Sequence, residues 1–355
     1  MLLEGLHIPI TTPFQADGSV ALDKLERNVA RYSKTLAAGL IVLGRSGEPT
    51  LLSDDETRDV LRTAAEAAAP EKVLLAGIAR DSVRSVLALA DFAAEQRYDA
   101  ILIAAPTTLT GRSKQRYDEL LTFFQTIADR SLLPIVLART NVRSSLDDVF
   151  PIIAAHSNVA GCLNSLGATP SMHRFGTNRL IQQTASIRRE VTVTSTFAAV
   201  TARMLAAESA PTPALVSAQS LTGSATAIAG PLALAPVLRT RTKCIGFQIL
   251  SGNSGSLLDA LDDGATGIAP AFATAAPQAC YEIYAAWKDG DAALAEEKQA
   301  RIREAAALAE SLGPGGLKYA CDLNGYAAGL PRLPLLPPTG EQRAALEALM
   351  HPLRN

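Results

Sequence analysis

The sequence predicts a parallel (β/α)8 barrel, the TIM-barrel fold class, from three observations. Short apolar runs rich in β-branched residues recur along the chain, and each is followed by a longer segment with helical periodicity. There are eight such runs. Each is apolar enough to be covered on both faces, as the strands of parallel sheets are. Strand alternating with helix eight times therefore indicates a barrel.

The predicted strands and the helix starts between them follow in chain order. The strands are LHIPIT (6–11), LIVLG (40–44), KVLLAGIA (72–79), DAILIAA (99–105), PIVLA (134–138), NVAGCL (158–163), GFQILSG (246–252) and ATGIAPAF (265–272). SDDE (53–56) has the spacing of a capping box, and Asp81 and Ser82 follow the third strand. These signals mark the start of the second and third helices.

An insertion and a tail depart from this rhythm. Residues 168–243 are rich in Ala, Thr, Ser and Pro and separate strands six and seven by far more than one helix requires. Residues 194–207 are the predicted sixth helix, and the rest of the insertion is predicted to be a loop. After an eighth helix at 276–287 come a charged helix at 288–310 and a last helix at 340–350. The charged helix is predicted to be a solvated face with Glu/Lys and Glu/Arg pairs. We therefore predict a barrel over 1–288, including the insertion, and a C-terminal helical extension over 289–355.

Composition excludes several classes of partner. The 355 residues carry a net charge of −2, without a basic face for nucleic acid or a polybasic segment for anionic membranes. The four cysteines are far apart and are predicted to be buried thiols rather than metal ligands: Cys162, Cys244, Cys280 and Cys321. The N-terminus lacks the cationic region of a signal peptide, so a cytoplasmic location is expected.

Several motifs lie at or near the predicted strand ends, where barrels of this class carry their active sites. They are GLHIPITTPF (5–14), GRSGE (44–48) followed by LLSDDE, PIVL (134–137), VAG before Cys162, and LSGN (250–253). Together they resemble the dihydrodipicolinate synthase and N-acetylneuraminate lyase family of pyruvate-dependent aldolases. The tail GGLKYACDLNGYAAGLPRLPL (315–335) is most similar to the 4-hydroxy-2-oxoglutarate aldolase branch. The resemblance covers nearly the whole chain except the insertion.

The resemblance also implies that the catalytic positions of the family are substituted. In the family, a lysine at the end of strand six forms a Schiff base with pyruvate, usually within GIKDSxG. The corresponding GCLNSLG (161–167) has Leu163 in that position. The strand-five motif LYNxP reads LARTN (137–141), so the tyrosine position is Ala138. The two threonines of the family's GTTGE turn become Arg45 and Ser46. Without the amine, the iminium pathway is lost.

No other lysine is expected to replace the missing one. Lys72 and Lys243 precede strands three and seven and should lie at the opposite end of the barrel, and Lys318 belongs to the C-terminal extension. Two aromatic motifs of the family are altered as well. PTTLT (106–110) stands at an expected subunit contact, and YAAG (326–329) stands where the branch has YYGG.

The polar residues that remain are predicted to bind a small carboxylate. The predicted binding residues are Thr12, Ser46, Gly47, Glu48, Arg143, Asn164, Gly252 and Ile268. Arg143 stands where the family has its carboxylate-binding arginine, and an arginine offers a two-pronged fork to a carboxylate. Arg45 fits a ligand and a pairing, with Glu48 or with a carboxylate at a subunit contact, equally well. His7 is predicted to be a satisfied core or barrel-bottom histidine rather than a catalytic base.

Three hypotheses follow. The first is an active carbon–carbon lyase of the 4-hydroxy-2-oxoglutarate aldolase or dihydrodipicolinate synthase type that uses a non-standard residue set. The second, which the joint loss of lysine and tyrosine favours, is a homologue without Schiff-base activity. It would bind a small 2-oxo acid or related carboxylate, as a homo-oligomer or as the partner of an active paralogue. The third, a metal-dependent aldolase, is weak because the strand ends lack a cluster of metal ligands. No cofactor is expected.

Overall fold

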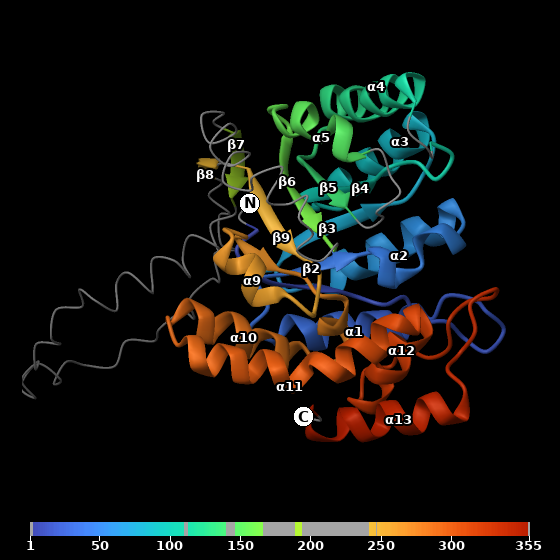
Figure 1. Ribbon diagram of the computed structural model, residues 1–355. Helices are drawn as coiled ribbons and strands as arrows, with labels where there is room; N and C mark the ends of the chain where they lie inside the picture. Colours follow the sequence, from blue (N-terminus) through green and yellow to red (C-terminus); the bar gives the residue numbers. More distant parts are fainter. Residues whose placement is uncertain are drawn as a thin grey trace, which may run out of the picture. The chain divides into compact units, whose positions relative to one another are not determined.

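The eight predicted strands form a closed parallel barrel in the order β1-β10-β9-β6-β5-β4-β3-β2 (Figure 1). The structure is a computed structural model that describes residues 3–109, 113–139, 146–165, 189–193, 241–245 and 247–353. The barrel strands are β1 Gly5–Pro9, β2 Gly39–Val42, β3 Val73–Ile78, β4 Ala100–Ala104, β5 Ile135–Arg139, β6 Val159–Asn164, β9 Gln248–Ser251 and β10 Gly267–Ile268. Each lies within or overlaps its predicted segment, so the predicted fold class is confirmed.

Helices follow the strands and cover the outside of the barrel. They are α1 Leu22–Ser33, α2 Asp54–Ala67, α3 Val83–Glu95, α4 Lys114–Arg130, α5 Leu146–Ala154, α9 Leu257–Asp262 and α10 Pro277–Lys288. The predicted capping box of α2 is present: the Ser53 hydroxyl accepts from the Glu56 amide at 3.2 Å, and the Glu56 carboxylate accepts from the Ser53 amide at 2.9 Å. Ser82 caps α3 by accepting from the Ser85 amide. These caps fix where the two helices begin.

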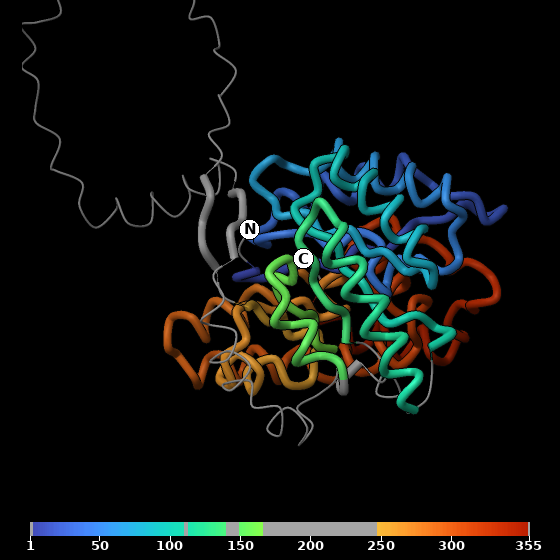
Figure 2. Tube along the Cα trace, turned by 90° about the horizontal axis from the view of Figure 1, so that it is seen from above, coloured from blue at the N-terminus to red at the C-terminus, as the bar shows by residue number. Residues whose placement is uncertain are grey.

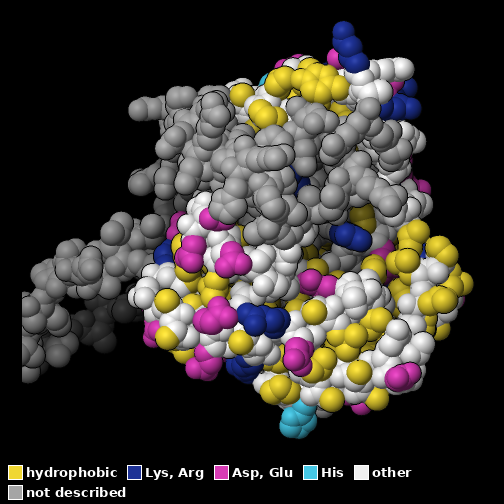
Figure 3. Space-filling model, in the orientation of Figure 1, with side chains coloured by type: hydrophobic (Ala, Val, Ile, Leu, Met, Phe, Trp, Pro, Cys, Tyr) yellow, Lys and Arg dark blue, Asp and Glu magenta, His cyan; other side chains and the backbone are white. Residues whose placement is uncertain are grey.

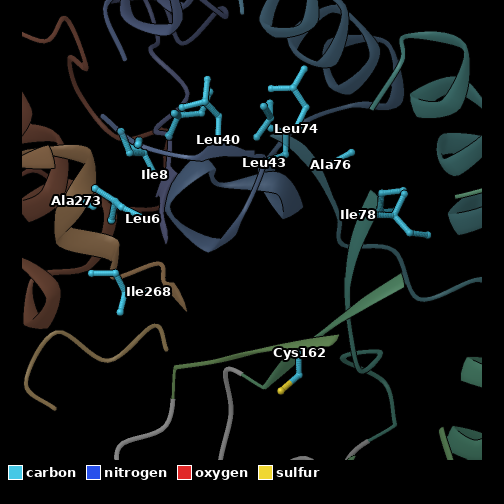
Figure 4. Packing of buried hydrophobic residues seen from close by; sticks show 14 of the residues in the cluster. Leu6, Ile8, Leu40, Leu43, Leu74, Ala76, Ile78, Cys162, Ile268 and Ala273 are labelled. Carbon is cyan, nitrogen blue, oxygen red and sulfur yellow. The ribbon is translucent and has the colours of Figure 1, made fainter. Parts of the chain in front are cut away.

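The alternation of side chains along the strands divides the core into two parts. One set faces the helices and joins their apolar sides in a single cluster. Figure 4 shows members of this cluster from several strands: Leu6, Ile8, Leu40, Leu74, Ala76, Ile78, Cys162 and Ile268. The other set faces the barrel interior and includes buried Ile41, Leu75, Leu102, Ala138 and Leu163, none of which belongs to the helix-facing cluster.

The inserted segment contributes a small unit of its own. Residues 190–243 cluster separately from the unit that contains residues 1–189 and 244–355. Two strands that the sequence pattern did not predict, β7 Arg189–Val193 and β8 Arg241–Ile245, pair in a two-stranded sheet. The predicted helix at 194–207 lies outside the described residues, as does most of the predicted loop.

The C-terminal helices pack with the barrel in one compact unit. They are α11 Ala292–Ser311, α12 Gly313–Leu323 and α13 Gly340–Met350, and they lie against one another and against α10 (Figure 1). In Figure 2 the red C-terminal segment runs beside the blue N-terminal one. The rings of Tyr32 and Tyr326 stack there with centroids 4.4 Å apart, and the Asn28 amide donates to the Ala327 carbonyl. The extension is therefore fixed to the first helix of the barrel.

The described surface mixes charges of both signs. On the face in Figure 3, basic and acidic side chains alternate with apolar ones. The charged helix α11 forms the predicted exposed pairs, such as Arg303 with Glu296 at 3.0 Å. Three of the four cysteines are buried as predicted: Cys162, Cys280 and Cys321. In the part of the chain that the structure describes, no helix is long and apolar enough to cross a membrane.

Candidate functional site at the barrel mouth

The C-terminal ends of the strands place the turn after β2 opposite the end of β6. In the closed ring, β2 and β6 are separated by three strands in either direction, so they face one another across the barrel axis. Barrels of this class bind and transform ligands at this end. The turn after β2 contains the predicted Ser46 and Gly47, and β6 ends at Leu163 and Asn164.

The turn after β2 has a strained and closely packed backbone. Two non-glycine residues bracket it in the left-handed region, Leu43 with φ 56° and Glu48 with φ 55°. Such conformations cost about 1–3 kcal/mol each and concentrate at functional sites. A Cβ atom at Gly77 on β3 would lie 2.1 Å from the Leu43 carbonyl oxygen, so only glycine lets the turn lie across β3. The Thr12 hydroxyl donates to the Gly47 carbonyl at 2.7 Å and holds the turn from β1.

This geometry assigns several predicted ligand-binding residues to the support of the turn. Thr12 has its hydroxyl proton directed at Gly47, so it holds the turn and does not donate to an anion. The Gly47 amide donates to the Gly44 carbonyl at 2.8 Å within the short helix η1, Arg45–Gly47. The Ser46 side chain is buried in the same turn, and within the described residues no hydrogen bond engages its hydroxyl. Ser46 is therefore the residue of this turn whose donor is available to a ligand.

The Glu48 carboxylate, predicted to bind a ligand, contacts other groups of the chain. Its Oε1 atom lies 2.6 Å from the Nζ atom of Lys318 on α12, and both side chains are fully buried. Its Oε2 atom accepts from the Arg332 amide at 2.9 Å. The Lys318 ammonium also donates to the Leu330 carbonyl at 3.0 Å. Burial lowers the pKa of Lys318, and the nearby Glu48 charge opposes that shift.

A second ion pair ties the C-terminal extension to the same turn. The Arg332 guanidinium binds both oxygens of Glu56 at 2.5 and 2.7 Å and donates to the Leu51 carbonyl. The ring of Phe14 lies between the two cations, 4.1 Å from the Lys318 ammonium and 4.6 Å from the Arg332 guanidinium. Residues from the two ends of the chain thus hold the β2 turn in place.

A buried carboxylate of the extension supports the neighbouring loops. Glu310 on α11 accepts from the Ser254 hydroxyl at 2.5 Å and from the Phe272 amide at 3.1 Å. Burial raises the pKa of Glu310, and the nearby Arg45 guanidinium acts against that rise. Arg45 itself is exposed. Neither Glu310 nor Glu48 forms a described ion pair with Arg45, so its partner stays a prediction.

The ends of β5 and β6 place the two substituted positions side by side. Ala138 and Leu163 are partners in the strand register, and both face the barrel interior. Each side chain retains 7% of its exposure. A Cβ atom at Gly252 would lie 3.1 Å from the Cδ1 atom of Leu163, so the leucine extends toward the loop after β9. The predicted positions Ala138, Leu163 and Gly252 are thus brought together at the mouth.

Two other predicted site residues face away from the barrel interior. Ile268, predicted to bind a ligand, is fully buried in the helix-facing cluster (Figure 4). Asn164 follows the inward-facing Leu163 and therefore has the opposite orientation. Its Oδ1 atom lies 3.5 Å from the Arg139 guanidinium, which itself lies over the Phe150 ring of α5. Asn164 is thus part of the contact between β6 and α5.

The remaining candidates lie elsewhere. Arg143 falls outside the described residues. His7 lies in the core on β1 as predicted, but among the described residues neither of its ring nitrogens has a hydrogen-bond partner, so it is not a satisfied histidine. Burial lowers its pKa to about 4. Among the described residues, no three His, Cys, Asp or Glu side chains come together as a metal-binding group.

Sequence reasoning missed three residues that shape the mouth: Glu310, Lys318 and Arg332. The helix with Glu310 was interpreted as a solvated face, and Lys318 was dismissed as part of the extension. One signal was present. Lys318 lies in an apolar stretch, GLKYAC, where a lysine without a buried partner would be costly.

Comparison with known proteins identifies the family. The sequence matches the dihydrodipicolinate synthetase family over residues 2–207 and 232–352. The 4-hydroxy-tetrahydrodipicolinate synthases of Methanothrix thermoacetophila and Acidiphilium cryptum are each 25% identical to this chain, which they match over 98% of its length and over 96% and 98% of their own.

Solved structures share the fold. A dihydrodipicolinate synthase from Bacillus anthracis superposes with a TM-score of 0.75 at 19% identity over 100% of both chains. An N-acetylneuraminate lyase from Mycoplasma synoviae gives a TM-score of 0.70 at 18% identity, over 99% of this chain and 98% of its own. Since the family match extends over most of the sequence, and the barrel has the same architecture, this chain is a member of the dihydrodipicolinate synthetase family.

Proposed function

We propose that this family member binds a small carboxylate at the barrel mouth and does not form a Schiff base with it. One observation carries the proposal: the paired positions at the ends of β5 and β6 are Ala138 and Leu163. Neither side chain can act as a nucleophile or transfer a proton. Imine formation needs an amine that can lose its proton. Lys318, the buried lysine behind the β2 turn, has its Nζ atom in contact with the Glu48 carboxylate and the Leu330 carbonyl.

Carboxylate binding is supported by the turn on the opposite side. The Ser46 hydroxyl lies in a turn that is fixed by Thr12 and by the buried Glu48 carboxylate. A donor that is held in place before the ligand arrives costs less entropy on binding. Arg143, which the family resemblance assigns to the ligand carboxylate, would supply the positive charge.

A second candidate function rests on the relatives. The two relatives named above are called 4-hydroxy-tetrahydrodipicolinate synthases. An active lyase with a different set of residues is therefore the alternative, and assembly with an active paralogue is a third arrangement. Only the active lyase would carry covalently attached pyruvate on this chain.

Borohydride trapping distinguishes the alternatives. We expect the intact mass of the protein to stay unchanged after treatment with pyruvate and borohydride, because the wild-type site offers no amine for the imine. A stoichiometric adduct would overturn the proposal in favour of the active lyase. Loss of that adduct in Lys318→Arg would then identify the amine.

Thermal shift tests the binding itself. A ligand that binds only the folded state at a hundredfold excess over Kd adds about 3 kcal/mol to the free energy of unfolding. We expect small carboxylates to raise the midpoint for the wild type, and Arg143→Ala to reduce the shift. Arg130→Ala, an exposed arginine at the end of α4, is the matched control. If no carboxylate raises the midpoint, or if Arg143→Ala responds like the control, the proposed site is wrong.

A further inference from the structure

One wall of the barrel mouth is entirely apolar. Four neighbouring strands carry partners at one level of the register: Ala104 with Ala138, Ala138 with Leu163, and Leu163 with Leu250. In-register partners of a parallel sheet face the same side. None of the four belongs to the helix-facing cluster, whereas the residue before each of them does: Ile103, Leu137, Cys162 and Ile249. The four side chains therefore line the interior, and we call them the apolar wall.

The apolar wall is not completely covered by the rest of the chain. Ala104 is half-buried, and Ala138 and Leu163 each retain 7% exposure, whereas Leu250 is fully buried. The exposed atoms therefore belong to the members on β4, β5 and β6. Partly exposed apolar atoms at the strand ends favour a ligand that removes them from water.

The turn after β2, which carries Ser46, faces the apolar wall across the barrel axis. Ser46 lies in the turn after β2, and β2 is diametrically opposite β6, the strand of Leu163. The interior of a (β/α)8 barrel is filled by side chains, and ligands bind above it, between the C-terminal ends of the strands and the turns that follow them. A carboxylate held at Ser46 would therefore direct its next carbon atoms toward the apolar wall.

The chemistry of that wall discriminates between ligands. A 2-oxo acid carries a second carbonyl oxygen next to its carboxylate. Against Ala138 and Leu163 that oxygen would lose its hydrogen bonds to water without replacement, which is unfavourable. Methylene or methyl groups at the same place would gain from burial.

We infer that the mouth takes a short aliphatic monocarboxylate whose second carbon carries hydrogen or alkyl groups and no oxygen. The inference rests on the carboxylate binding proposed above and narrows its ligand class. The inferred ligand class excludes 2-oxo acids, whose oxo group would react with an amine.

Isothermal titration of the full chain with ligands matched in length tests the inference. We expect butyrate to bind on the order of tenfold more tightly than 2-oxobutyrate. Between acetate, propionate and butyrate, each methylene should improve affinity by about fourfold until the space is filled. Equal or tighter binding of 2-oxobutyrate would overturn the inference while leaving the carboxylate site intact. Absence of binding by all of these acids would contradict the proposed function as well.

Variants assign the discrimination to the wall. Leu163→Asn places an amide in the wall and should bring the ratio of butyrate to 2-oxobutyrate affinity close to one. Ser46→Ala should weaken both acids by a similar factor, because it removes the contact to their shared carboxylate. Ile268→Val, at the same end of the barrel but facing the helices, is the control and should leave the ratio unchanged. If Leu163→Asn does not fold, Ala138→Ser replaces it. An unchanged ratio in a folded wall variant would overturn the inference.

Discussion

The turn after β2 and the ends of β5 and β6 face each other across the barrel mouth and are built in opposite ways. The turn is polar, and its backbone is held by the Thr12 hydroxyl and the buried pair of Glu48 with Lys318. The ends of β5 and β6 carry only Ala138 and Leu163 toward the interior. The part of the mouth suited to hold a carboxylate is thus elaborately supported, whereas the part expected to perform the covalent step is apolar. This difference is why we propose binding rather than covalent turnover.

Restoring the amine should give the largest effect, because the expected change is from no adduct to a stoichiometric one. Leu163→Lys places an amine in the interior, where partial desolvation lowers its pKa and favours imine formation. We expect pyruvate and borohydride to trap this variant. Ala138→Tyr, added to it, should raise cleavage of 4-hydroxy-2-oxoglutarate by more than the two separate effects combined, because residues that act as one catalytic unit are not additive.

Ala104→Lys is the matched control for this repair, since it places an amine at the same level of the register on β4. It should be trapped much less. Failure to trap a folded Leu163→Lys protein, alone or with Ala138→Tyr, would show that Leu163 does not occupy the position of the family lysine. The ends of β5 and β6 could then no longer be regarded as the part of the mouth that has lost the covalent step.

Breaking the support of the β2 turn should have the next largest effect. Lys318→Met leaves the Glu48 carboxylate buried without its cation, and removal of one member of a buried pair typically costs about 3–5 kcal/mol. The double variant with Glu48→Gln should cost less than the sum of the single variants. Lys298→Met, which disrupts a partly exposed pair with Glu282, should cost about 1 kcal/mol or less. Urea unfolding measures all four. A cost for Lys318→Met as small as that of the control would mean that the pair does not support the turn.

His7, which is fully buried, should make the folded protein less stable at acidic pH. Burial lowers the pKa of His7 to about 4, below its ordinary 6.5, so the unfolded chain takes up a proton before the folded one does. The free energy of unfolding should therefore be unaffected above about pH 7 and fall by about 3 kcal/mol between pH 6.5 and 4 from this residue alone. In His7→Met this contribution should disappear, which unfolding measured at pH 7 and pH 4 would detect. An identical pH dependence in the variant would show that folding does not lower the pKa of His7.

The fold was predictable because each buried strand is a local apolar run, and caps such as Ser53 with Glu56 are local as well. The orientation of single residues was harder to predict. Side chains alternate between the two faces of a strand, so an error of one residue exchanges the interior for the helix side. Ile268, for example, was predicted to bind a ligand and is buried in the helix-facing cluster.

The support of the β2 turn could not be predicted from the sequence, because it joins residues that are far apart in the chain. Glu48 meets Lys318 across 270 positions, and Glu56 meets Arg332 across 276. Charge patterns along one helix identify pairs such as Arg303 with Glu296, but they contain no information about partners on another element. The closed barrel and the packed extension bring these groups together.

The smallest expected effect comes from breaking the partly exposed ion pair of Arg332 with Glu56, which also supports the β2 turn. The Arg332 guanidinium beside Glu56 lowers the pKa of that carboxyl to about 2, below its ordinary 4.5. A carboxyl whose folded pKa is lowered stabilises the protein above its unfolded pKa, and the contribution is lost as the pH falls toward the folded value. Both side chains are partly exposed, so we expect Arg332→Met to cost only about 1 kcal/mol at pH 7, and the cost to diminish between pH 4.5 and 2. Arg332→Lys keeps the charge without the two-pronged fork and should give an intermediate cost.

Unfolding at pH 7 and pH 3 gives these values, and NMR titration of Glu56 gives its pKa. A Glu56 pKa that stays near 2 in Arg332→Met would show that other groups lower it, and the extension would then hold the turn through Lys318 and the Arg332 amide alone.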